Sequence, residues 1–386
     1  MNSRKSKVLI MLSRYEINGV CAVAKNLIDN FDRNRFEVVL LIEKIAERHF
    51  PVDRNIKIID LDVNPQKRIL RKIKNVWSIL RSIALVCKEE KPDVVLTFGF
   101  SPNCYAILAL RLLNKIDTKI IITEHCEAFL VRFKRTTLKE RVWAAGYRIM
   151  IYFLYRSADC IVAVSENIAR LIRKRLFYIR KDRVRVIYNP IDILNIENLS
   201  KESVDDLVFQ KDVYHIAIMS RLSQEKGIEY LLEAVRDLKD KIQLRVLIMG
   251  EGEEKDRLKS LSLKYGIEKN VQFLGWQKNP FKYLAKCDIF ALPSMSEGFP
   301  NAILEAMVCG VCVVASRCTP ALEEIVDDRE DGILVAPKNG EELSQAIYIL
   351  LTDNELRKKI RYNAFKKVKR FDISKIIKEY EEILVK

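Results

Sequence analysis

The stretch DIFALPSMSEGFPNAILEAMVCGVCVVAS, residues 288–316, has the pattern of a strand, a loop, a helix and a second strand. Both ends are short apolar runs that suit buried strands, and Pro300 fits the start of a helix because it has a preset φ and no N–H. A strand–helix–strand unit places its two strands parallel in one sheet. The stretch therefore predicts an α/β protein.

The same alternation runs through the whole chain of 386 residues. Strands are expected at KVLIML (7–12), FEVVLLI (36–42), DVVLTFG (93–99), KIIITEH (119–125), ADCIVAVS (158–165) and VRVIYNP (184–190). After a seam near residues 189–200 the pattern restarts with YHIAIMS (214–220) and LRVLIMG (244–250). Continuous Val, Ile and Leu runs between helices indicate parallel sheets covered on both faces. We therefore predict two Rossmann-like domains in tandem.

The net charge of +15 is clustered in three segments, residues 67–91, 132–156 and 170–185. These segments fit solvated helix faces, a nucleic-acid surface or an anionic membrane surface. Nucleic acid is the weaker interpretation, because no zinc-finger spacing or RNA-binding signature is present. In residues 132–156 the cations alternate with aromatic side chains, which suits a lipid headgroup boundary: Trp143, Tyr147, Tyr152, Phe153 and Tyr155.

The remaining composition is typical of a globular cytoplasmic protein. No signal peptide is recognisable, and the strongly apolar run IMIYFLY (149–155) is too short to cross a bilayer. The nine cysteines are scattered, which favours reduced thiols. Cys309 and Cys312 form a CxxC, but their surroundings indicate a buried strand, so we expect no metal there.

Ligands of parallel sheets bind at the carboxyl ends of the strands, and in a two-domain chain the expected site is the cleft between the domains. The motif RLSQEKG follows the strand at 214–220 and contains Arg221 and Lys226, with Gly227 opening the next helix. A planar guanidinium and a compact ammonium at a strand end suit a diphosphate. The alternative is that both cations are merely solvated.

Two glutamates, Glu297 and Glu305, lie on either side of the expected helix start. If the eight-residue step between them were helical, it would span roughly 12 Å, wider than the pair of acids of a glycoside hydrolase. Such a spacing suits acids at opposite ends of a nucleotide-sugar, although a loop acid and a solvent-facing helix acid would give the same pattern. Between them, free backbone N–H groups are expected to form an anion site at Asn301, Ala302 and Ile303.

The first half of the chain offers two further candidates. Gly19 follows the first expected strand and would let a ligand approach the backbone, although one glycine in a strand–helix turn is a weak signal. His125 ends the expected strand 119–125, at the same edge as the other candidates.

Together these residues resemble a retaining glycosyltransferase of family 4 (group 1) with the GT-B fold. SEGFPNAILEAM resembles the paired-glutamate motif of that family, RLSQEKG its diphosphate clamp, and the histidine of ITEHC the one near the donor sugar. ADCIVAVSENIARLI, VRVIYNPID and the C-terminal FDISKIIKEYEEIL are also similar to family segments. The Gly-Gly loop of the family is Asn18-Gly19 here, and the linker motif has Asn189-Pro190 in place of Asn-Gly.

The resemblance implies an acceptor domain at 1–190, a nucleotide-sugar domain at 191–370, and a helix at 371–386 that packs back on the first domain. It implies catalytic roles for Glu297, His125, Arg221 and Lys226. Donor binding is implied for these side chains together with Gly19, Phe299, Pro300, Asn301, Ala302, Ile303 and Glu305.

The implied reaction moves a hexose or N-acetylhexosamine from a nucleotide diphosphate sugar, with UDP favoured and GDP possible, to a lipid-linked or cell-surface glycan. No metal or other cofactor is expected, and the location implied is peripheral, on the cytoplasmic face of a membrane. Alternatives are an epimerase or sugar-phosphate synthase of the same fold, and a non-enzymatic nucleic-acid-binding protein. An oxidoreductase is disfavoured because no GxGxxG follows the first strand.

Overall fold

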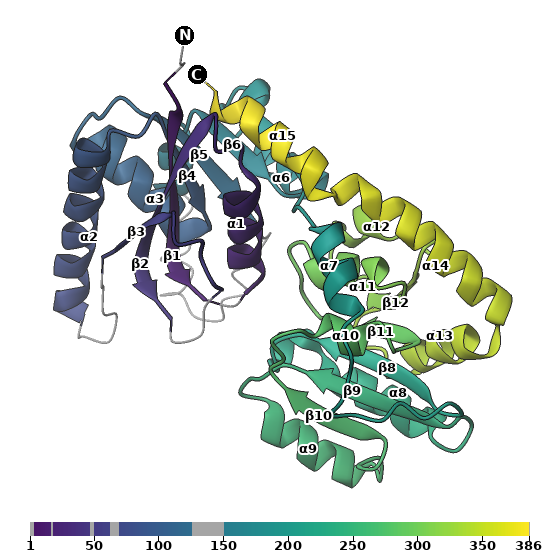
Figure 1. The fold of residues 1–386 in the computed structure, drawn as a ribbon. Helices are drawn as coiled ribbons and strands as arrows, with labels where there is room; N and C mark the ends of the chain where they lie inside the picture. The colour runs from purple at the N-terminus through teal and green to yellow at the C-terminus, as the bar shows by residue number, and fades with distance from the viewer. Residues whose placement is uncertain (1–3, 17, 47–49, 62–68, 126–149, 386) are drawn as a thin grey trace. The chain divides into compact units, whose positions relative to one another are not determined.

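The structure, a computed structural model, describes residues 4–16, 18–46, 50–61, 69–125 and 150–385. The chain divides into two compact units: unit 1 comprises Met1–Pro190 with Ile373–Lys386, and unit 2 comprises Ile191–Asp372. Each unit holds one parallel sheet with helices between its strands (Figure 1). The predicted α/β class with two Rossmann-like sheets is confirmed.

Unit 1 has a seven-stranded sheet in the order β3-β2-β1-β4-β5-β6-β7, and every pairing in it is parallel. Its strands are rich in Val, Ile and Leu and are mostly buried, as expected of a sheet covered on both faces. The bounds are β1 Ser6–Tyr15, β2 Phe36–Ile45, β3 Lys57–Asp60, β4 Val94–Phe98, β5 Lys119–Glu124, β6 Cys160–Ala163 and β7 Val184–Val186.

The helices of unit 1 include the last helix of the chain. They are α1 Gly19–Asn30, α2 Ile69–Glu90, α3 Phe100–Ile107, the π-helix η1 Leu108–Leu113, α6 Glu166–Arg175, the short 3-10 turn η2 Lys181–Arg183 and α15 Ile373–Leu384. The helices α1 and α15 share one hydrophobic core with β1, in which Leu12, Leu27 and Tyr380 are buried together. Glu381 of α15 accepts hydrogen bonds from the Asp32 N–H at 3.0 Å and from Arg35 at 2.6 Å. The C-terminal helix therefore packs on the N-terminal sheet.

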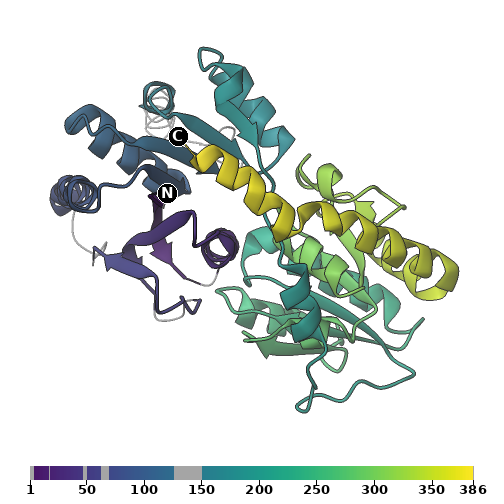
Figure 2. The ribbon, with the colours of Figure 1, turned by 45° about the horizontal axis from the view of Figure 1, so that its top comes forward.

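Unit 2 has a six-stranded parallel sheet in the order β10-β9-β8-β11-β12-β13. Its strands are β8 Tyr214–Met219, β9 Leu244–Met249, β10 Val271–Gly275, β11 Ile289–Leu292, β12 Cys312–Ser316 and β13 Ile333–Val335. The helices and 3-10 turns are α7 Ile193–Ser200, η3 Gln224–Lys226, α8 Ile228–Leu238, α9 Lys255–Lys264, α10 Phe281–Leu284, α11 Asn301–Val308, α12 Leu322–Ile325, α13 Gly340–Thr352, α14 Asn354–Val368 and η4 Lys369–Phe371 (Figure 2).

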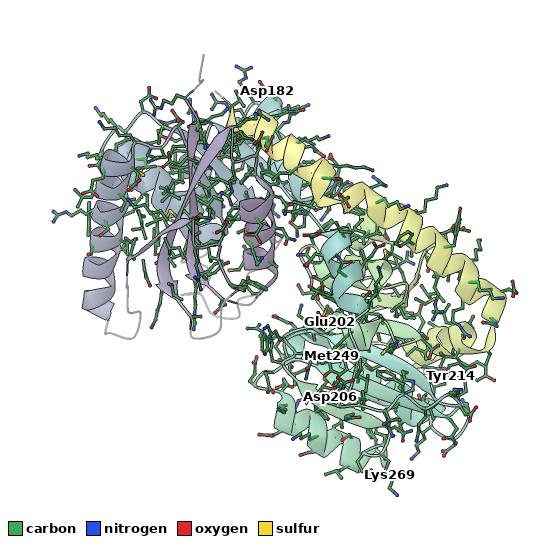
Figure 3. All side chains as sticks on the ribbon, viewed as in Figure 1. Asp182, Glu202, Asp206, Tyr214, Met249 and Lys269 are labelled. Carbon is green, nitrogen blue, oxygen red and sulfur yellow. The ribbon has the colours of Figure 1, made fainter. Side chains whose placement is uncertain are left out.

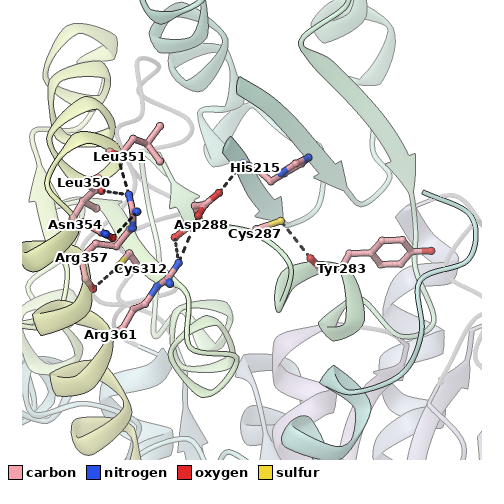
Figure 4. A network of polar contacts seen from close by, with 10 residues as sticks. All are labelled: His215, Tyr283, Cys287, Asp288, Cys312, Leu350, Leu351, Asn354, Arg357 and Arg361. Carbon is pink, nitrogen blue, oxygen red and sulfur yellow. Dashed lines mark hydrogen bonds and ion pairs between the residues drawn. The ribbon is translucent and has the colours of Figure 1, made fainter. Parts of the chain in front are cut away.

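A polar network fastens α14 to the amino ends of the unit 2 strands (Figure 4). Asp288, just before β11, accepts a hydrogen bond from the His215 N–H at 3.0 Å and lies 3.8 Å from the Arg361 guanidinium. Arg357 donates to two carbonyls at the end of α13, and the Cys312 thiol donates to the Arg357 carbonyl at 3.4 Å. These polar side chains serve the fold, because they lie at the edge opposite the carboxyl ends of the strands.

All cysteines in the described part of the chain are free thiols, and Cys312 lies in the buried strand β12. No helix within the described ranges is both long enough and apolar enough to span a bilayer. Most of the predicted basic aromatic segment 132–156 lies outside the described residues, which resume at residue 150.

Candidate functional site

The loops that follow β8 and β11 meet at the carboxyl edge of the unit 2 sheet, because these two strands are neighbours. The Met295 N–H donates a hydrogen bond to the Glu225 carbonyl at 2.8 Å. Gly227 has a φ of +59°, and a Cβ added there would lie 2.2 Å from the Pro293 carbonyl oxygen. Only glycine therefore fits this contact, which brings the RLSQEKG and SEGFPN segments together.

An ion pair between Lys226 and Glu297 occupies this loop junction. The Lys226 Nζ lies 2.7 Å from the Glu297 Oε1, and the Ser294 hydroxyl donates to the same oxygen at 2.7 Å. The side chains of Lys226 and Glu297 are 20% and 9% exposed, so each charge would be poorly solvated alone. Two predicted site residues are thus brought together, although the sequence analysis gave them separate roles.

Arg221 occupies a different environment from Lys226. Its side chain is 62% exposed and pairs with Glu225 at 2.8 Å. The two cations of the predicted diphosphate clamp therefore have different carboxylate partners in the absence of ligand.

The helix α11 begins at Asn301 with Pro300 as its N-cap, which agrees with the expected helix start. The Ile303 N–H donates to the Pro300 carbonyl at 3.1 Å, so the prediction that it is free was wrong. The reason is that residues 297–300 are not helical, so the first turn closes with a short-range bond of its own. Because these residues are not helical, the distance of roughly 12 Å expected between Glu297 and Glu305 for a continuous helix does not apply. Asn301 and Ala302 are half-buried at the helix start.

Of the two other predicted residues of this motif, Phe299 is buried and Glu305 is half-buried. Phe299 is buried, and its ring lies 5.9 Å from the ring of Phe371, so it supports the loop from within unit 2. Glu305 is half-buried, and desolvation raises its pKa to about 7. No lysine or arginine among the described residues forms an ion pair with it. Glu305 is therefore partly shielded from solvent and has no cationic neighbour in the described part of the chain that would keep it ionised.

Gly19 and His125 belong to unit 1, whereas the other predicted site residues belong to unit 2. Gly19 is the exposed first residue of α1, and the Asn18 Oδ1 caps this helix by accepting a hydrogen bond from the Cys21 N–H at 2.8 Å. Asn18, which stands where the family has a glycine, thus has a structural role.

His125 lies directly after β5 and is half-buried. Its ring centroid is 5.7 Å from that of Phe98, and its Nε2 lies 2.9 Å from the Thr123 hydroxyl. Burial lowers the pKa of His125 to about 4, so its ring is neutral near pH 7.

A buried polar cluster beside His125 was missed by the sequence analysis. Glu124, at the end of β5, accepts hydrogen bonds from the Asn103 amide at 2.8 Å and from the Tyr155 hydroxyl. Burial raises the pKa of Glu124 to about 7. Tyr155 is fully buried, so its assignment to a membrane-facing aromatic patch was wrong, because its hydroxyl serves this carboxyl group. The sequence feature that could have predicted this cluster is the presence of polar residues inside otherwise apolar strands: Thr97 in β4, and Thr123 and Glu124 in β5.

The loop after β9 was also missed. The Leu222 N–H donates to the Glu251 carbonyl at 2.9 Å, and a Cβ added at Gly252 would lie 2.2 Å from the Leu222 carbonyl oxygen. The GEG sequence after an apolar strand was the signal for this close backbone approach.

Across the described ranges, no three His, Cys, Asp or Glu side chains cluster closely enough to hold a metal ion.

Two protein families match the chain, one over each half. Residues 17–193 match the family described as Glycosyltransferase Family 4, and residues 200–367 match the family described as Glycosyl transferases group 1.

Individual relatives align over most of the chain. An N-acetylgalactosamine-N,N'-diacetylbacillosaminyl-diphospho-undecaprenol 4-alpha-N-acetylgalactosaminyltransferase of Campylobacter jejuni is 30% identical over 346 residues, covering 89% of this chain and 90% of the relative. A second Campylobacter jejuni enzyme, an alpha-1,4-N-acetyl-D-galactosaminyltransferase, is 25% identical over 352 residues, covering 90% of each chain. Among solved structures, Anabaena HepE in complex with UDP and glucose superposes with a TM-score of 0.77 at 22% identity, covering 98% of this chain and 99% of HepE.

The raised pKa of Glu305 predicts a pH-dependent contribution to stability. Between the unfolded pKa of about 4.3 and the folded pKa of about 7, the native state holds a proton that the unfolded state has lost. Stability therefore falls as pH rises through this window. From pH 5 to pH 8, we expect the unfolding free energy of the wild type to fall by about 1–3 kcal/mol more than that of the Glu305→Gln variant.

Urea unfolding followed by circular dichroism at both pH values measures this difference. Glu355→Gln is the matched control, because the Glu355 side chain is 84% exposed. Equal losses in the wild type and in Glu305→Gln would show that Glu305 titrates normally.

Proposed function

We propose that the chain, which belongs to the family 4 (group 1) glycosyltransferases, moves a hexose or N-acetylhexosamine from a nucleotide diphosphate sugar to a hydroxyl of a lipid-linked or cell-surface glycan. UDP is the favoured nucleotide and GDP is possible. The chain has the GT-B fold of this family. The observation that carries the proposal is the ion pair of Lys226 and Glu297 at the carboxyl edge of unit 2. Because the chain belongs to a glycosyltransferase family, we set aside the alternative of a non-enzymatic nucleic-acid-binding protein.

The proposed acceptor class is supported by relatives. The Campylobacter jejuni relative is named for an acceptor on diphospho-undecaprenol and for transfer of N-acetylgalactosamine. HepE has been crystallised with UDP and glucose, which supports UDP as the nucleotide.

In the proposed reaction, the bond from the anomeric carbon to the diphosphate breaks while a bond to the acceptor oxygen forms on the same face. The acceptor proton passes to the departing phosphate oxygen, so the anomeric configuration is retained. Lys226, Arg221 and the amides at the start of α11 would stabilise the charge that develops on the diphosphate. These groups would make a metal unnecessary.

The remaining residues would hold the two ends of the donor. When Lys226 turns toward a diphosphate, the Glu297 carboxylate becomes able to accept hydrogen bonds from sugar hydroxyls. Glu305 would accept hydrogen bonds from the ribose diol, and these donors would compensate a carboxylate that has no basic partner within the described residues. His125 would contact the donor sugar.

We also propose that unit 1 docks peripherally on the cytoplasmic, anionic face of a membrane. Phe153 and Phe177 are 64% and 77% exposed, and both rings contact the ring of Tyr152. Six cations and one acid, Asp182, lie in residues 150–156 and 174–183; Figure 3 labels Asp182. Exposed aromatic rings among cations suit a lipid headgroup layer.

A transfer assay with radiolabelled donors tests the proposed activity. We expect transfer from a UDP-hexose or UDP-N-acetylhexosamine to diphospho-undecaprenol-linked N-acetylgalactosamine or to octyl glycosides, with an unchanged rate in excess EDTA. Loss of activity in EDTA with recovery on adding Mg²⁺ would contradict the metal-free mechanism. No transfer from any UDP- or GDP-sugar would contradict the function.

Replacing Lys226 tests the role of the ion pair in turnover. We expect Lys226→Ala to lower kcat about 100-fold or more, because a charge aimed at the leaving diphosphate is lost. Lys358→Ala, which removes an exposed lysine of unit 2, is the control. Circular dichroism should show that both variants are folded; a folded Lys226→Ala with the wild-type kcat would remove Lys226 from the mechanism.

Vesicle flotation tests the membrane surface. We expect the Phe153→Ser, Phe177→Ser double variant to float about tenfold less than wild type with vesicles containing phosphatidylglycerol. Tyr362→Ser, which removes an exposed aromatic residue of unit 2, should float as the wild type does. Equal flotation of all three proteins would show that Phe153 and Phe177 belong to an ordinary solvated surface and do not bind the membrane.

A further inference from the structure

The Thr123 hydroxyl lies within hydrogen-bond distance of two groups, the Thr97 carbonyl and the His125 Nε2. A hydroxyl has one proton to donate, and the Thr123 hydroxyl donates it to the Thr97 carbonyl at 2.8 Å. A carbonyl oxygen cannot donate, so this direction is fixed. When the Thr123 hydroxyl donates to this carbonyl, the 2.9 Å contact between the Thr123 oxygen and the His125 Nε2 requires the Nε2–H as its donor.

We propose that Thr123 is a positioning residue that holds His125 as the neutral, Nε2-protonated tautomer, which leaves Nδ1 to accept a hydrogen bond from a hydroxyl of the donor sugar. The assignment of the partner as a sugar hydroxyl rests on the proposed function. The low pKa that burial gives His125 agrees with a neutral ring. A protonated imidazolium would offer only N–H donors and could not accept from a hydroxyl.

Thr123 is itself held by the buried cluster. The Asn103 Nδ2 donates to the Thr123 carbonyl at 2.9 Å and to the Glu124 Oε1 at 2.8 Å. The Thr97 hydroxyl donates to the Asn103 Oδ1 at 2.5 Å. Because Thr97, Asn103 and Thr123 are fully buried, these bonds are shielded from competing water. They fix the backbone that carries both the hydroxyl and His125.

The His125 ring also packs beside the ring of Phe98. Its plane lies at 32° to that of Phe98, with the centroids 5.7 Å apart. The imidazole is therefore held at Nε2 by a hydrogen bond and packs beside an aromatic ring. A ring held in this way keeps Nδ1 in a fixed direction, which a group that receives a substrate hydroxyl requires.

Nitrogen NMR of histidine-labelled protein tests the tautomer directly. The chain has three histidines, so the His125 signals can be assigned from the spectrum of His125→Gln. We expect the wild type to show a protonated Nε2 and a bare Nδ1 at His125 near pH 7. We expect Thr123→Val to lose this single pattern and to show mixed tautomers, and Thr123→Ser to keep it.

Thr118→Val is the matched control for losing a buried threonine hydroxyl. The Thr118 hydroxyl donates to the Pro92 carbonyl at 2.7 Å, just before the other end of β5. We expect this variant to keep the wild-type His125 signals. A protonated Nδ1 in the wild type, or a Thr123→Val spectrum that matches the wild type, would overturn the proposal.

Kinetics provide a second readout with the donor identified by the transfer assay. We expect Thr123→Val to lower kcat/KM for the donor about tenfold, as the loss of one aligned hydrogen bond would, and Thr123→Ser to stay within about twofold of the wild type. Unchanged kinetics in Thr123→Val would also overturn the proposal. The NMR result does not depend on turnover: a fixed tautomer without transfer refutes the proposed function alone, and transfer without a fixed tautomer refutes this inference alone.

Discussion

The ion pair of Lys226 and Glu297 is the interaction on which the candidate site of unit 2 depends. It joins the loop after β8 to the loop after β11, and the Ser294 hydroxyl strengthens it through the same carboxylate oxygen. Neither charge is well solvated, so removing one partner would leave the other in an unfavourable environment. The pair therefore holds both side chains at the strand ends before any ligand binds. A diphosphate could replace the carboxylate at Lys226 without leaving the ammonium unpaired.

The position of this pair follows from the sheet topology. In unit 2 the strand order reverses between β8 and β11, and in unit 1 it reverses between β1 and β4. At such a point the loops on either side run to opposite faces of the sheet, which opens a crevice at the carboxyl edge. Lys226 and Glu297 come from the two loops at the unit 2 reversal. Gly19 follows β1, one of the two strands at the unit 1 reversal.

The sheets were predictable because strand formation leaves a local signal. Runs such as KVLIML and LRVLIMG fall inside β1 and at β9, where continuous burial requires continuous apolar sequence. The short strand β3 was not predicted, since KIID carries little such signal. In the site, Lys226 and Glu297 were each identified, but their pairing was not, because it joins residues 71 positions apart. The burial of Tyr155 likewise depends on tertiary geometry that no local pattern encodes.

The charge states of the site suggest how binding energy would be divided between ground state and transition state. Lys226 is compensated by Glu297, and Arg221 is paired with Glu225. In the proposed reaction an incoming diphosphate would compete with these carboxylate partners, which would weaken its binding in the ground state. As the bond to the sugar broke in this reaction, negative charge on the diphosphate would grow and the competition would shift in its favour. Cations that are already paired would thus contribute more to the transition state of the proposed reaction than to substrate binding, and only such a difference raises the rate of a chemical step.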